Sequence, residues 1–349
     1  MTDPDQHLAE AVFRHYSVGS PRAVRFIPSG LIHRTYCVET EQGHFILQRL
    51  HPDLSSDALL ADYRAVTDYL ADQHFPGPNL LVTRSGELTV LLDGYRHRLM
   101  TYLEGISHDE VRDDAMAGEA GQMLGRFHVS VSEFRYTFKS NRPLHDSAKH
   151  FEAFQKIVSP DALKKLAGTI PREDVATMTA VILDEFPRHF LPCPLPSRIV
   201  HGDPKISNVL FDPSSGRAVG MVDLDSCARH TVLVDLGDAV RSWCREGRED
   251  QPTPFLPNRF RALLVGYLSA QASLSQQERS LIVQACHLIT LEMTSRFLRD
   301  IVEDRYFGWD AGRYSSRAEH NFARACGMFA LYRSMLDYRT DMDRIVAQL

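Results

Sequence analysis

The sequence has little of what marks secreted, membrane-spanning or nucleic-acid-binding proteins. Its six cysteines form no C-x-x-C pair, so we expect neither a disulfide framework nor a structural zinc site. No apolar run approaches the roughly 18 residues that cross a bilayer, and the opening segment MTDPDQHLAE lacks the basic and apolar parts of a secretory signal. The formal net charge of -6 gives no general attraction to nucleic acid or to anionic lipid. These absences predict a cytoplasmic protein with no nucleic-acid and no membrane partner.

What is present is the pattern of a folded protein with two differently built parts. In the first third of the chain, residues 35–40 and 45–50 flank the turn Glu41-Gln42-Gly43 and predict a hairpin, and residues 55–73 have helical spacing. Later helical patterns fall at residues 115–131, 172–190, 258–270, 275–303 and 316–338. We therefore predict an α+β fold. A small β-rich N-terminal lobe spans residues 1–103, and a larger, mainly helical C-terminal lobe spans residues 104–349.

One polar loop and hairpin interrupt the helical part and carry candidate chemistry. The strand-like residues 209–212 and 218–223 flank a strong turn signal. Antiparallel pairing about that turn would place Asn208 opposite residues 221–223, beside Asp223, with Asp203 at the same end. Asn208 and Asp223 could then share a Mg²⁺ ion, which takes its other ligands from water and phosphate. Asp203 could accept the proton of an attacking hydroxyl, so the pattern predicts phosphoryl transfer.

These residues resemble a known catalytic loop. The catalytic loop of protein kinases is similar to His201-Gly202-Asp203 with Asn208 five residues after the aspartate. Asp223 occupies the sequence position of the metal-binding aspartate of those kinases. Gly202 replaces the usual arginine, Val222-Asp223-Leu224-Asp225 replaces Asp-Phe-Gly, and no Ala-Pro-Glu segment follows. These departures resemble the aminoglycoside phosphotransferase and choline kinase group. The resemblance implies a bilobal protein-kinase-like fold that uses ATP and Mg²⁺ to phosphorylate a small-molecule hydroxyl.

The resemblance also implies a nucleotide site in the N-terminal lobe. Residues 30–36 look like the turn over the phosphates, with Gly30 and Thr35 as candidates. The hinge would hold adenine through Thr101, Tyr102 and Leu103. A basic residue on the strand at 45–49 would hold the phosphates. Successive strand residues face opposite sides, so Gln48 or Arg49 could face the cleft, and we favour Arg49.

Other polar residues are assigned supporting roles, with simpler alternatives left open. Lys205 would contact the transferring phosphate or else be a solvated lysine. His201 and Asp235 would hold the catalytic loop in place. Asp225 would contact a second metal or the substrate, or cap the next segment. The last group would either line the acceptor pocket or form a salt-bridged surface face; its members are Glu292, Arg296, Arg299 and Asp300.

A narrower resemblance points to N-acetylhexosamine 1-kinases. It rests on residues 45–50, 222–225, 237–241, 296–300, 306–307 and 320–325. The acceptor that we predict first is therefore an N-acetylhexosamine. An amino alcohol, homoserine, an aminoglycoside and methylthioribose remain alternatives, as does a nucleotide-binding pseudoenzyme. The sequence leaves open whether GTP replaces ATP and whether the chain is a monomer or a homodimer.

Overall fold

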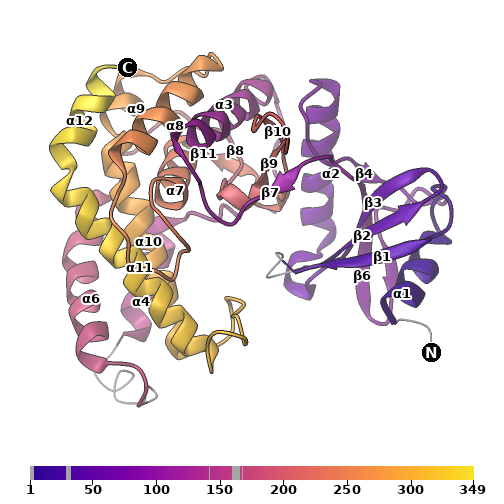
Figure 1. Cartoon of the computed structure of the whole chain (residues 1–349), viewed down its shortest axis with the longest axis horizontal. Coiled ribbons are helices and arrows are strands. Elements are labelled where there is room, and N and C mark those ends of the chain that lie inside the picture. The colour runs from indigo at the N-terminus through magenta and orange to yellow at the C-terminus, as the bar shows by residue number, and fades with distance from the viewer. Residues whose placement is uncertain (1–3, 29–32, 141, 159–165, 167) are drawn as a thin grey trace.

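The computed structural model describes residues 4–28, 33–140, 142–158, 166 and 168–349. Figure 1 shows a sheet-containing part that holds the N-terminus beside a larger helical part that holds the C-terminus. This arrangement confirms the predicted α+β class with a β-rich N-terminal lobe and a helical C-terminal lobe. The exact division after residue 103 stays a prediction. Within the described residues, no helix is long and apolar enough to cross a membrane.

The N-terminal sheet is antiparallel, in the order β1-β2-β3-β6-β4, with β5 paired to β6. Its strands are β1 (Ala23–Ile27), β2 (Arg34–Thr40), β3 (Gly43–Arg49), β4 (Leu80–Leu81), β5 (Val90–Leu92) and β6 (Tyr95–Thr101). The predicted hairpin is confirmed as β2 and β3, because Thr35 pairs with Gln48 and Thr40 with Gly43.

Two helices cover opposite faces of this sheet. Helix α1 (Pro4–Phe13) packs with Leu47 and Leu99 in one buried cluster. Helix α2 (Asp57–Asp72) belongs to the main core together with Met100. In Figure 1, α2 stands on the side of the sheet that faces the helical lobe. Because neighbouring strand residues alternate between faces, the α2 face of β3 and β6 is the face directed at that lobe.

The C-terminal lobe is built around one long buried helix. Its helices are α3 (Asp114–Ser130), α4 (Ser147–Ile157), α6 (Arg172–Glu185), α7 (Leu233–Trp243), α8 (Pro257–Ser269), α9 (Gln276–Ser280), α10 (Ile282–Glu303), α11 (Arg317–Asp337) and α12 (Arg339–Ala347). Helix α10 packs against α7, α11 and α4, and it is buried along most of its length. The predicted helix at 275–303 is two helices, which meet at Leu281. The helix predicted at 172–190 ends at Glu185, where Pro187 enters a 3₁₀ turn and supplies no backbone N–H.

Short strands frame the polar loop between the helices. Strands β7 (Ile106–Ser107), β9 (Val209–Phe211) and β10 (Ala218–Met221) form one small sheet, and β8 (Arg198–Val200) pairs with β11 (Ala228–His230). The loop therefore leaves one small sheet and enters another, which fixes both of its ends.

Candidate active site

The predicted hairpin brings Asn208 and Asp223 together. Val209 pairs with Met221, and the backbone N–H of Val222 donates to the carbonyl of Asn208 at 2.9 Å. The expectation that Asn208 lies opposite residues 221–223 is confirmed, which places it beside Asp223. The Asn208 side-chain amide also donates to the backbone carbonyl of Asp203 at 2.8 Å. Residues that lie fifteen positions apart in the chain thus share one site with Asp203.

Lys205 connects the two carboxylates of this site. Its Nζ lies 2.7 Å from Oδ2 of Asp203 and 3.8 Å from Oδ2 of Asp223. Burial alone would raise the pKa of Asp203, but the charges of Lys205 and Arg241 hold it below the usual range. Partial desolvation and the nearby carboxylates of Asp225 and Asp203 raise the pKa of Asp223. Asp203 is consequently an ionised acceptor at neutral pH, as a proton acceptor for a hydroxyl must be.

The backbone of Asp223 adopts a left-handed conformation, with φ of 64°. That conformation is costly for a residue with a side chain and is concentrated at functional sites. It lies between β10 and the 3₁₀ turn Leu224–Ser226, and the side chain of Asp223 remains 42% exposed. A carboxylate held open to solvent at this point can coordinate a cation.

A buried carboxylate holds the catalytic loop from behind. Asp235, on α7, accepts backbone hydrogen bonds from His201 at 2.7 Å and from Gly202 at 2.9 Å. Its third partner is Nε2 of His128 at 2.9 Å, and His128 in turn contacts the hydroxyl of Tyr267. Burial opposes ionisation of Asp235, but these donors lower its pKa. Asp235 has the position that a loop-supporting role requires, and His128 is a partner to which the sequence assigned no role.

His201 also has the position expected of a structural residue. Its Nε2 lies 3.0 Å from the carbonyl of Val222, to which it can donate, and its Nδ1 accepts from the N–H of Asp203 at 3.3 Å. The ring therefore links the catalytic loop to the segment that carries Asp223.

On the nucleotide side, the structure reverses our preference for Arg49. The Arg49 guanidinium stacks on Tyr95, 4.6 Å from the ring centroid, on the α1 face of the sheet. Gln48 faces the helical lobe instead, where its Oε1 accepts from Arg98 and its Nε2 donates to Thr35. Strand alternation fixes this outcome, because Leu47 and Arg49 share the face that α1 covers.

The remaining nucleotide candidates have mixed outcomes. Gly30 lies outside the described residues. Thr101 ends β6 and pairs with Asn79. Tyr102, whose ring contacts His44, and Leu103 follow Thr101 in the link between β6 and β7. The hinge role of these three residues stays a prediction.

The acceptor candidates on α10 lie in a buried polar network. Glu292 accepts from the Ser147 hydroxyl at 2.6 Å and contacts Nδ1 of His145 at 2.8 Å. Arg296 lies 3.6 Å from Glu292 and within 5.7 Å of the centroids of the Tyr306 and Phe307 rings. The alternative of an exposed salt-bridged face is wrong for Glu292 and Arg296, because both are buried.

Asp300 anchors a turn. Its carboxylate accepts from the backbone N–H groups of Arg305, Tyr306 and Phe307, and from the Asn321 amide. These four bonds engage both carboxylate oxygens, so Asp300 positions the aromatic pair after α10.

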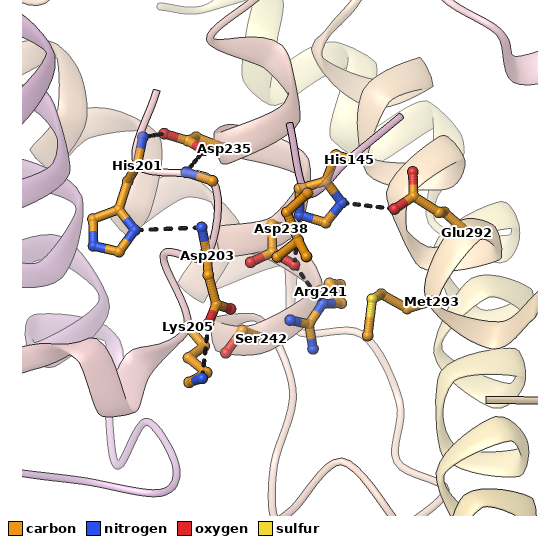
Figure 2. Close-up of polar contacts among 12 residues, drawn as sticks. His145, His201, Asp203, Lys205, Asp235, Asp238, Arg241, Ser242, Glu292 and Met293 are labelled. Atoms are coloured by element: carbon orange, nitrogen blue, oxygen red, sulfur yellow. Dashed lines mark hydrogen bonds and ion pairs between the residues drawn. The ribbon is translucent and has the colours of Figure 1, made fainter. Parts of the chain in front are cut away.

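Helix α7 adds Asp238 and Arg241, which lie in the segment 237–241 of the narrower resemblance but had no role assigned, and the loop before α4 adds His145. Figure 2 shows His145, Asp238 and Arg241 between the catalytic loop and Glu292 on α10. Arg241 donates to Asp238 at 2.7 Å, and Nε2 of His145 lies 3.6 Å from the same Asp238 oxygen. The segment Gly-Asp-Ala-Val-Arg at 237–241 was the available signal, since it places an acid and a base three residues apart on one helix face.

The donor set at Asn208 and Asp223 fits Mg²⁺ better than a metal that needs a closed protein cage. Among the described residues, no group of three or more His, Cys, Asp or Glu side chains could enclose a metal ion. One amide and one carboxylate form an incomplete set of hard oxygen ligands, which Mg²⁺ completes with water and phosphate oxygens.

The fold and this site define the protein-kinase-like class of phosphotransferases. Two solved structures share the fold over nearly the whole chain. The microcompartment-associated aminopropanol kinase is 17% identical with a TM-score of 0.67, covering 97% of this chain and 99% of its own. The amicoumacin kinase hAmiN, in complex with AMP-PNP, Ca²⁺ and Ami, is 15% identical with a TM-score of 0.63, covering 96% and 94%.

The family follows from the sequence comparison. The model of the phosphotransferase enzyme family, APH, matches residues 23–272, and the chain belongs to this family. It is therefore a phosphotransferase that acts on a hydroxyl of a small molecule. A relative named homoserine kinase, from Methylocella silvestris, is 28% identical over 244 residues, covering 69% of this chain and 70% of that protein. The group-level resemblance is confirmed, whereas these findings do not support the narrower one to N-acetylhexosamine 1-kinases.

Proposed function

We propose that the protein transfers the terminal phosphate of ATP to a hydroxyl of a small polar molecule, with Asp203 as the base. The observation that carries this proposal is the convergence of Asp203, Lys205, Asn208 and Asp223 at the end of one hairpin. The ionised Asp203 would accept the hydroxyl proton while the hydroxyl oxygen attacks the terminal phosphorus. The bond to ADP then breaks, and its electrons leave with the ADP oxygen.

The other residues would hold the reacting groups. Asn208 and Asp223 would bind Mg²⁺, whose contribution is to neutralise negative charge on the phosphates. Lys205, which already contacts both carboxylates, would hold Asp203 in place and can move toward the transferred phosphate. Asp235 and His128 would keep the loop from shifting, which matters because phosphoryl transfer depends on positioning.

Homoserine is the first acceptor to test. It carries a carboxylate and an ammonium group besides its hydroxyl, and relatives over more than two thirds of this chain are named homoserine kinases. The network beside Asp203 contains cations for the carboxylate, in Arg241 and Arg296, and anions for the ammonium, in Asp238 and Glu292. Such a paired network can recognise a zwitterion.

An N-acetylhexosamine is the second candidate, supported by a different observation. Three segments of the narrower resemblance, 296–300, 306–307 and 320–325, meet at the C-terminal end of α10, where Arg296 lies against the Tyr306 and Phe307 rings and Asn321 holds Asp300. Aromatic rings beside hydrogen-bonding groups suit a sugar, which presents both C–H faces and hydroxyls. The family match ends at residue 272, before α10 begins, so family membership does not decide this acceptor.

The test is ADP release from Mg-ATP over a panel of acceptors, with Asp203→Asn as the matched variant. The panel contains homoserine, N-acetylglucosamine, N-acetylgalactosamine, hexoses, choline, ethanolamine, methylthioribose and an aminoglycoside, and GTP is compared as donor. We expect one class to support turnover and the variant to lose about 10²- to 10⁴-fold in rate while still binding nucleotide. Wild-type turnover by Asp203→Asn would contradict the proposed base. Nucleotide binding with no turnover on any acceptor would favour a pseudoenzyme.

A further inference from the structure

The strand that should carry a phosphate-binding cation carries a neutral side chain at the required position. Gln48 is the β3 residue that faces the helical lobe, and Arg49 points to the opposite face. ATP phosphates bring several negative charges, and protein sites normally balance them with a fixed cation. The neighbouring strand β6 supplies a candidate.

Arg98 lies directly beside Gln48 in the sheet. The two residues pair directly across β3 and β6. Arg98 lies on the same face of β6 as Met100, which belongs to the core shared with α2. Its guanidinium lies 4.0 Å from the centroid of the Tyr63 ring on α2. The side chain is only 2% exposed. An arginine on β6 thus projects to the position that a β3 cation would otherwise occupy.

The guanidinium is held by groups from both lobes. Nε and Nη2 donate to the Gln48 amide oxygen at 2.9 and 2.6 Å. Nη1 and Nη2 donate to the Asp225 carboxylate at 2.8 and 2.5 Å. These four bonds use four of the five N–H donors of an arginine, so among the described residues one Nη1 N–H is left over for another acceptor.

The carboxylate partner ties this cation to the reaction site. Asp225 follows Asp223 by two residues, across the 3₁₀ turn that Asp223 begins. Buried charges in proteins are normally paired, and the Asp225 carboxylate is the charged partner of the buried Arg98 guanidinium. The pair therefore fixes the position of the Arg98 guanidinium next to the segment that would hold the metal and its phosphates.

We propose that Arg98 is the phosphate-binding cation of the nucleotide site, moved from β3 to β6, and that Gln48 and Asp225 hold its guanidinium in place. This inference rests on the proposed function, since it assigns a role within nucleotide binding. It also gives Asp225 a role that differs from a second metal ligand. Gln48 is part of the arrangement, because its amide oxygen accepts two N–H groups without cancelling their charge.

The test measures binding of ADP and AMP-PNP by calorimetry, independently of any acceptor. We expect Arg98→Met to weaken binding by about tenfold or more, the loss typical of one charge-assisted hydrogen bond. Arg49→Met is the matched control, because it removes the same charge from the other face of the sheet, and we expect unchanged affinity. Thermal melting of each variant verifies that it is folded.

Two double variants keep the test decisive. Arg98→Met/Asp225→Asn avoids a lone buried carboxylate and should fold while binding nucleotide as weakly as the single variant. Gln48→Lys/Arg98→Met returns a cation to β3, and we expect it to recover much of the affinity. Wild-type affinity in the folded Arg98→Met/Asp225→Asn variant would overturn the inference alone. A wild-type protein that binds no nucleotide would overturn the proposed function and the inference with it.

Discussion

The glycine of the catalytic loop is fixed by contact as well as by conformation. Gly202 has a φ of +84°, and a Cβ added there would lie 2.3 Å from the backbone carbonyl oxygen of Ser226. That oxygen belongs to the backbone, so it cannot move aside as the end of a flexible side chain could. This contact accounts for a glycine between His201 and Asp203, where protein kinases carry an arginine.

We therefore expect Gly202→Ala to disturb both the fold and the chemistry. The left-handed strain and the clash should together cost at least about 1–3 kcal/mol, and Asp203 should move with the loop. Chemical unfolding and ADP release measure the two effects. Gly216→Ala is the matched control, because Gly216 has a φ of +71° but no neighbour within 4 Å of the added Cβ. Equal losses in the two variants would show that the Ser226 contact is unimportant.

Sequence spacing could locate residues within one loop but not the face of a strand. Asp203, Asn208 and Asp223 were found because a turn and antiparallel pairing determine which residues lie together, whatever surrounds them. Choosing between Gln48 and Arg49 required knowing which sheet face α1 covers, and Arg98 pairs with Asp225 from 127 positions away. Contacts of that kind depend on the packing of the two lobes, which no local pattern records.

At the scale of elements, helices α3 and α8 cross at backbone contact distance. A Cβ added at Gly266 on α8 would lie 2.0 Å from the carbonyl oxygen of Gly118 on α3, and one at Gly121 would lie 2.2 Å from that of Leu263. The crossing matters for the site because α3 also carries His128, which holds Asp235. Helical periodicity identified α3 and α8, but the role of their glycines appears only once the helices are placed together.

Gly266→Ala should consequently destabilise the protein, although alanine is the better helix former. Separating the helices to make room should cost about 1–3 kcal/mol, measured as the shift in free energy of unfolding in urea. Gly118→Ala on the partner helix is the control. Its added Cβ would meet the Ala262 carbonyl oxygen at 3.6 Å, an ordinary contact, so helix propensity should make it neutral or stabilising by up to about 1 kcal/mol. Stabilisation by Gly266→Ala would contradict the close crossing.

Across the whole molecule, buried histidines link stability to pH. His287 on α10 is fully buried, and its ring lies 5.0 Å from that of His189 and 5.8 Å from that of Tyr332. Burial, followed by the charge of the neighbouring histidine and of Arg339, lowers the pKa of His287 to about 3. Burial likewise lowers the pKa of His189 to about 4. Both rings are therefore neutral in the folded protein at pH values where the unfolded chain binds protons.

His287 and His189 should each contribute a loss of folding stability as the pH drops from 7.5 to 5. Above the ordinary histidine pKa of 6.5, neither state binds a proton. Below it only the unfolded state does, so each ring removes up to about 1.4 kcal/mol per pH unit until its folded pKa is reached. His145 acts in the opposite sense, because its contact with Glu292 outweighs burial and raises its pKa. The pH dependence of wild-type stability alone therefore does not reveal the contribution of His287. The variant His287→Leu isolates that contribution. Urea unfolding at pH 7.5, 6 and 5 should show a smaller loss of stability for this variant than for the wild type. Parallel losses would mean that His287 gains its proton equally in both states, which its full burial in α10 argues against.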